Sequence, residues 1–85
     1  MTKTTTIEIP EAGTGDEDGL NNTHANDGWV IINRYMDRTG SDKENALCDL
    51  LGDLMHYAHQ NGDDFARELQ RACDHFAAET ANGAE

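Results

Sequence analysis

An Asn-Gly-Asp-Asp sequence at residues 61–64 separates two stretches whose apolar residues recur with the spacing of an α-helix. Asn-Gly ends a helix well, because glycine adopts the left-handed backbone conformation without steric cost, and an aspartate can then cap the next helix. A connection this short makes the two helices fold back on each other. We therefore expect an antiparallel helical hairpin formed by residues 42–60 and 64–81.

Both helices of the predicted hairpin are amphipathic. Ser41 and Glu44 have the spacing of a capping box at the start of the first helix, and Asp63 or Asp64 can cap the second. Asn82-Gly83 is expected to close the second helix. The apolar residues expected to supply the core are Leu47, Leu50, Leu51, Leu54, Tyr57 and Ala58 in the first helix, and Phe65, Leu69, Ala72, Cys73 and Phe76 in the second.

Residues 29–36, WVIINRYM, are the densest apolar segment and fit either a strand or a buried helix. We predict a helix over about 27–38 with Asp27 as a cap, since no second strand follows to complete a hairpin. Trp29, Ile32 and Met36 would then lie across the hairpin as a third layer. A second copy of the chain could instead supply that layer, which would make the protein a homodimer.

Residues 1–26 contain the only proline and few large apolar side chains, and we predict a disordered acidic tail there. The expected organisation is thus this tail followed by a small helical domain over residues 27–85. The fold class is all-α: a short helix plus an antiparallel helical hairpin.

The chain is strongly acidic, with 17 Asp and Glu against 6 Lys and Arg and a formal net charge of −11. Direct nucleic-acid binding is not expected, because it depends on Lys and Arg that displace counterions. The expected partner is a protein with a basic surface. We expect no membrane association. Two well-separated cysteines and the absence of an apolar leader indicate a cytoplasmic setting.

Asp49, Asp53 and His56 are spaced by four and three residues, so a helix presents them on one face. Two carboxylates and an imidazole could bind a divalent metal ion. The alternative is a solvated acidic face, because this face points away from the leucines. Zinc-binding motifs are absent from the sequence, and we expect neither a cofactor nor enzymatic activity.

Trp29, Arg34 and Tyr35 belong to the one local patch that is not acidic. Aromatic and arginine side chains are favoured anchors at protein interfaces, so this patch is a candidate docking site. The alternative is ordinary core, with the arginines paired to nearby acids.

Residues 46–76, ALCDLLGDLMHYAHQNGDDFARELQRACDHF, resemble uncharacterised short acidic helical proteins of bacterial phages, plasmids and integrative elements. In size and charge the chain also resembles anti-CRISPR and anti-restriction proteins. The same stretch is weakly similar to the last helices of MazG-type nucleotide pyrophosphohydrolases, a likeness that implies Asp49 and Asp53 as magnesium ligands. The chain lacks the upstream Glu-x-x-Glu of that family.

These features predict a non-enzymatic interaction module that presents carboxylates to a basic, nucleic-acid-binding surface of a host defence complex. A metal-dependent nucleotide pyrophosphohydrolase built around Asp49, Asp53 and His56 is one alternative. A regulator that binds one dedicated protein through Trp29 and Tyr35 is another.

Overall fold

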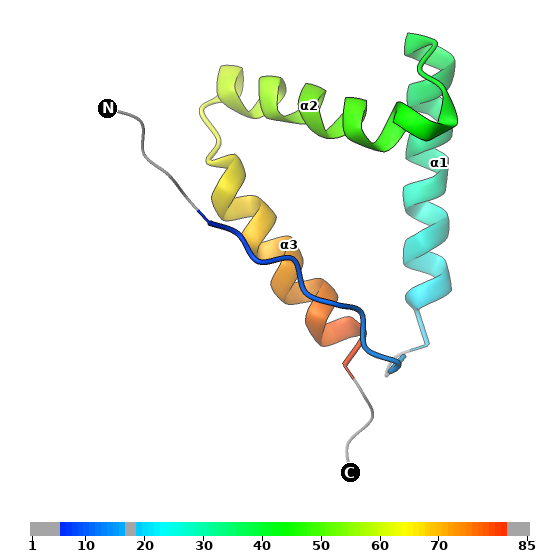
Figure 1. The fold of residues 1–85 in the computed structure, drawn as a ribbon, viewed down its shortest axis with the longest axis vertical. Coiled ribbons are helices and arrows are strands. Elements are labelled where there is room, and N and C mark those ends of the chain that lie inside the picture. The colour runs from blue at the N-terminus through cyan, green and yellow to red at the C-terminus, as the bar shows by residue number, and fades with distance from the viewer. Residues whose placement is uncertain (1–5, 17–18, 82–85) are drawn as a thin grey trace. The chain divides into compact units, whose positions relative to one another are not determined.

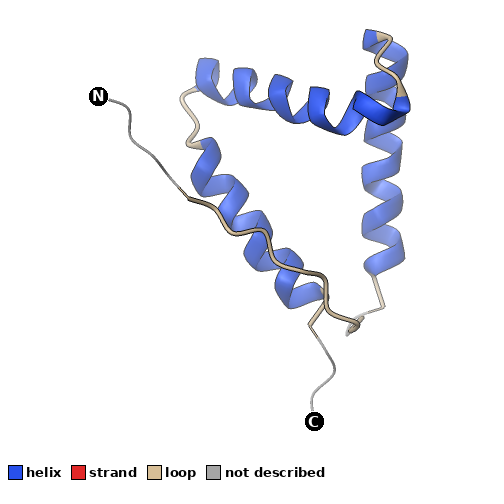
Figure 2. Cartoon of the chain, in the orientation of Figure 1, coloured by secondary structure: helices blue, strands red, loops and turns tan. Residues whose placement is uncertain are grey.

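The computed structural model describes residues 6–16 and 19–81. These residues form three α-helices and no strand, which confirms the predicted all-α class (Figures 1 and 2). The helices are α1 (Asn21–Thr39), α2 (Lys43–Asn61) and α3 (Phe65–Glu79). Residues 29–36 lie wholly within α1. Within the described ranges, no helix has both the length and the apolar character needed to cross a membrane.

The contacts of the chain divide it into two units, residues 22–63 and residues 1–21 with 64–85. Helices α1 and α2 belong to the first unit, and α3 belongs to the second. The short connection predicted between α2 and α3 is present. Because the two helices fall into different units, their antiparallel packing stays a prediction.

Helix α1 begins at Asn21, not near residue 27 as expected, so Asp27 lies inside the helix and does not cap it. The Asn21 backbone N–H donates to Asp16 Oδ1 at 3.1 Å, and the Asn21 side-chain amide donates to the Gly15 carbonyl at 3.0 Å. An acid five residues upstream therefore satisfies an N–H at the start of the helix, a role that helix-start patterns do not reveal.

Asp42, not Ser41, is the N-cap of α2. Its Oδ1 accepts hydrogen bonds from the Asn45 backbone N–H at 3.0 Å and from the Asn45 side-chain amide at 2.8 Å. A charged acceptor is a strong cap because it also interacts favourably with the helix dipole. The predicted capping box of Ser41 and Glu44 is therefore wrong, because Asp42 caps the helix and the Ser41 hydroxyl donates to Asp49 instead.

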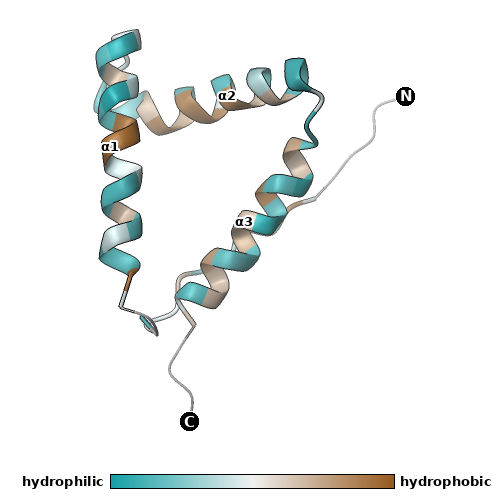
Figure 3. Cartoon of the chain, turned by 180° about the vertical axis from the view of Figure 1, so that it is seen from behind, coloured by the Kyte–Doolittle hydropathy of each residue, from teal (hydrophilic) through white to brown (hydrophobic). Residues whose placement is uncertain are grey.

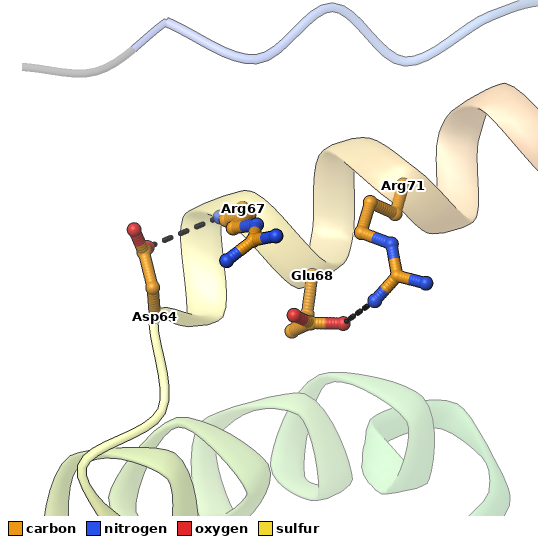
Figure 4. Close-up of polar contacts among 4 residues, drawn as sticks. All are labelled: Asp64, Arg67, Glu68 and Arg71. Atoms are coloured by element: carbon orange, nitrogen blue, oxygen red, sulfur yellow. Dashed lines mark hydrogen bonds and ion pairs between the residues drawn. The ribbon is translucent and has the colours of Figure 1, made fainter.

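The junction between α2 and α3 has the chemistry predicted for it. Gly62 ends α2 with φ +77°, and the Asp63 N–H donates to the Ala58 carbonyl at 2.9 Å. Asp64 caps α3, its Oδ1 accepting from the Arg67 N–H at 3.1 Å (Figure 4). The predicted stop at Asn82-Gly83 lies outside the described residues.

In the α1–α2 unit, α1 packs along a line on α2 formed by Ala46, Leu50 and Asp53. Ala46 is 1% exposed, Leu50 is half-buried, and Asp53 bonds to Tyr35 of α1. Ile32 and Met36 of α1 are half-buried as expected.

Helix α1 does not cover most of the residues predicted as the core of α2. Leu47, Leu51, Leu54 and Tyr57 are between 41% and 63% exposed, and Trp29 of α1 is 49% exposed. The reason is that α1 covers the neighbouring side of α2, where the small side chain of Ala46 allows a close approach.

In the other unit, residues 6–16 form neither helix nor strand, in keeping with the predicted tail, and they run beside α3 in the same direction (Figure 1). The N–H groups of Gly13 and Gly15 donate to the Thr80 Oγ1 and carbonyl oxygen, both at 3.2 Å. Ile9 and Pro10 line a pocket of about 230 Å³ together with Cys73, which is 7% exposed. This contact with α3 was not expected from the sequence.

Candidate functional site

An open hollow of about 550 Å³ lies between the end of α1 and one face of α2. Four of its lining residues were singled out from the sequence, namely Tyr35, Asp49, Asp53 and His56. The complete lining is Tyr35, Thr39, Gly40, Ser41, Cys48, Asp49, Gly52, Asp53 and His56. All of these residues belong to the α1–α2 unit.

Two glycines shape the hollow. Gly52 lies on the same face of α2 as Asp49 and His56, and open space surrounds the position where its side chain would be. The helix surface is therefore recessed between the acidic residues and His56. Gly40 has φ +78°, and its N–H donates to the Met36 carbonyl at 2.8 Å, so the chain can turn sharply from α1 into α2.

A neutral hydroxyl donates to each carboxylate in the hollow. The Tyr35 hydroxyl donates to Asp53 Oδ2, and the Ser41 hydroxyl donates to Asp49 Oδ2 at 2.5 Å. An ionised carboxylate has about four acceptor positions, so each aspartate retains capacity for further donors. No lysine or arginine is among the described residues that line the hollow. The site therefore presents two carboxylates that no lysine or arginine in its lining neutralises.

The hydrogen bond to Asp53 raises the pKa of Tyr35 from 10.0 to about 12, with smaller contributions from desolvation and from the negative charges of Asp53 and Asp49. Tyr35 is thus a neutral hydrogen-bond donor at physiological pH. That state makes it a poor nucleophile or base, and it fits a role in orienting Asp53.

In the described part of the chain, no group of three or more His, Cys, Asp or Glu side chains is placed to hold a metal ion. Asp49, Asp53 and His56 share the hollow, as their spacing predicts, but this arrangement does not bring them together as a ligand set. Each carboxylate is held by a hydroxyl from outside α2.

Trp29 and Arg34 do not line the hollow. Arg34 follows Ile32 by two residues, which places it about 160° around α1 from the side that packs on α2. Trp29 lies closer to that side and is half exposed. The structure therefore separates Tyr35 from the two residues grouped with it in the sequence.

Sequence reasoning missed Thr39 and Ser41 as part of the site. Thr39 Oγ1 donates to the Tyr35 carbonyl at 2.8 Å and accepts from the Ser41 N–H at 3.2 Å, so it links the tyrosine to the serine. The spacing of Asp49 and Asp53 in the sequence predicted that they share one face of α2. No local pattern indicated which hydroxyl groups would face these two carboxylates.

The chain matches no protein family model, and neither the curated proteins nor the solved structures include one that is similar to it.

Proposed function

We propose that this chain is a non-enzymatic protein-interaction module whose α1–α2 hollow receives a basic side chain from a partner protein. The observation that carries the proposal is the pair Asp49 and Asp53, held by neutral hydroxyls in a hollow whose described lining contains no lysine or arginine. No lysine or arginine in the described lining competes with an incoming cation for the two carboxylates.

An arginine guanidinium matches this hollow well. Its planar fork can donate to two carboxylate oxygens at once, and its face can stack on an aromatic ring such as that of Tyr35. The net charge of −11 adds a long-range attraction that steers the chain toward a basic surface.

Nucleic-acid-binding grooves display clustered lysines and arginines. The partner we propose is therefore a nucleic-acid-binding protein of a bacterial defence complex, the class that the resemblance to phage and plasmid proteins implies. By occupying the groove, the chain would block nucleic-acid binding.

The experiment is a titration of the full chain with an oligoarginine peptide, followed by NMR, with Asp49→Asn/Asp53→Asn as the test variant. The matched control is Asp27→Asn/Asp37→Asn, which removes the same charge from exposed positions of α1. We expect the test variant to weaken binding at least about tenfold and the control less than about threefold.

Salt provides a second readout. Raising NaCl from about 50 to about 300 mM should weaken the peptide complex severalfold. Equal losses in the two variants would show that diffuse charge, and not the hollow, binds the peptide. Binding that does not change with salt would overturn the electrostatic basis of the proposal.

One observation favours a second candidate function, a regulator that docks through α1. Trp29 is 49% exposed, and an exposed tryptophan is a favoured anchor at protein interfaces. Trp29→Ala should then abolish binding to the partner while the helix content by circular dichroism stays unchanged.

A further inference from the structure

Gly52 lies in the middle of α2, where neither the backbone nor the packing requires a glycine. The described glycines with positive φ are Gly19, Gly40 and Gly62, so the conformation of Gly52 is one that other residues adopt. Outside its chain neighbours and its own helical backbone, no atom lies within 4 Å of the position that its Cβ would occupy. A glycine inside a helix costs more backbone entropy than other residues. Position 52 therefore carries a destabilising residue that the fold itself does not need.

The space above Gly52 belongs to the α1–α2 hollow. Gly52 is half-buried and lines the hollow with Asp49, one turn before it, and His56, one turn after it. Figure 3 shows hydrophilic residues at intervals along α2, and the two aspartates and the histidine of the hollow are among the hydrophilic residues of this helix. The missing side chain at position 52 thus leaves room beside the carboxylates.

The other glycine inside a described helix is Gly28 of α1, and its surroundings differ. Open space also surrounds the position where its side chain would be, but Gly28 is exposed and does not line the hollow. A side chain at position 28 would extend into solvent, whereas one at position 52 would occupy part of the hollow. Gly28 therefore provides a matched control for the role of Gly52.

We propose that Gly52 makes the hollow selective for arginine over lysine, an inference that rests on the proposed function of the hollow. A guanidinium is flat and weakly hydrated, so its face can lie on the bare helix surface at Gly52 while its edge donates to carboxylates. Asp49 and Asp53 are four positions apart and therefore neighbours on the helix. The hydroxyls of Ser41 and Tyr35 bond to their Oδ2 atoms and leave the Oδ1 atoms as acceptors.

A lysine ammonium does not need the recess. It is a compact, strongly hydrated charge on a flexible stem, and it can reach one carboxylate from the solvent side. Filling the space above Gly52 should therefore weaken the binding of arginine much more than the binding of lysine.

Titrations of the full chain with oligoarginine and oligolysine peptides of equal length, followed by NMR, test the proposal. Because the two peptides carry the same charge, diffuse attraction contributes equally to both. We expect the native chain to bind the arginine peptide at least about fivefold more tightly. The arginine peptide should shift the amide signal of Gly52 and leave that of Gly28 in place.

Gly52→Leu should weaken arginine binding at least about tenfold and lysine binding less than about threefold, so that the preference disappears. Gly28→Leu is the matched control and should keep the native preference. Both variants should raise the melting temperature followed by circular dichroism, because leucine favours a helix more than glycine does. Gly52→Ala is a milder variant that should lose part of the preference, and it decides the matter if Gly52→Leu unfolds.

The outcomes separate this inference from the function on which it rests. A native chain that binds both peptides equally overturns the selectivity, while the hollow remains a site for basic side chains. Variants of Gly52 that keep the native preference also overturn it, as does an equal loss of arginine binding in Gly52→Leu and Gly28→Leu. A native chain that binds neither peptide overturns the proposed function itself.

Discussion

Tyr35 and Asp53 form the most informative residue pair in the structure, because they connect the two helices that enclose the hollow. The phenol donates to the carboxylate, so ionising Tyr35 would remove the hydrogen bond and place two negative charges in contact. The pair therefore favours the neutral tyrosine, and the Asp53 carboxylate keeps acceptor positions for donors from a partner.

This coupling predicts how Tyr35 titrates. The difference between the ultraviolet titrations of the native chain and Tyr35→Phe should report a pKa of about 12 for Tyr35, and Asp53→Asn should bring that pKa back toward 10.0. The folded-state pKa is raised, so the stabilisation from the pair is complete below pH 10 and disappears as the pH rises through 12. Asp37→Asn, which removes a charge on α1 that is not among the causes of the shift, should leave the titration of Tyr35 unchanged.

At the scale of the element, residues close to each helix end in sequence determine where the helix begins and ends. Gly62 with φ +77° ends α2, and Asp64 caps α3 two residues later. An exposed ion pair, Arg71 Nη1 to Glu68 Oε1 at 2.8 Å, joins the first turn of α3 to the next (Figure 4). Such an exposed pair contributes little, so the cap is the main local determinant of where α3 starts.

Removing the cap of α3 should therefore be measurable. Asp64→Ala should destabilise the chain by about 1 kcal/mol in thermal or urea unfolding, because the Arg67 N–H loses its acceptor. Asp63→Ala is the matched control, since it removes the neighbouring acid without removing the cap. If the two variants are equally stable, Asp64 does not act as the cap in solution.

At the scale of the whole molecule, contacts between distant parts of the chain define each unit. Gly13 and Thr80 are 67 positions apart in sequence, yet a hydrogen bond joins them and places residues 6–16 on α3. Thr80 is 8% exposed and Cys73 is 7% exposed, and Cys73 lines a pocket with Ile9 and Pro10, so this segment helps to shield Cys73.

The shielding predicts the reactivity of the two thiols. In a chain labelled with a thiol reagent, exposed Cys48 should react at once and buried Cys73 slowly. A variant that lacks residues 1–16 should label Cys73 at least about tenfold faster, and Cys48 at the native rate. Unchanged labelling of Cys73 in the truncated chain would mean that the segment does not cover it. Repeating the labelling in a Cys48→Ser variant leaves Cys73 as the only thiol, so the slow labelling phase can be assigned to Cys73.

The sequence by itself determined the class of the fold, the end of α2 at Gly62, a cap of α3 at Asp63 or Asp64, and the shared face of Asp49, Asp53 and His56. Each of these depends on residues within one or two helical turns, where backbone geometry and capping decide the outcome. Only the tertiary structure decided which side of α2 meets α1, and that side is not the one that carries Leu47, Leu51 and Leu54. Tyr35 and Asp53 are 18 positions apart, and no periodic pattern specifies that pairing. The physical reason is that several faces of α2 could pack with similar benefit, and the close approach allowed by Ala46 selects among them.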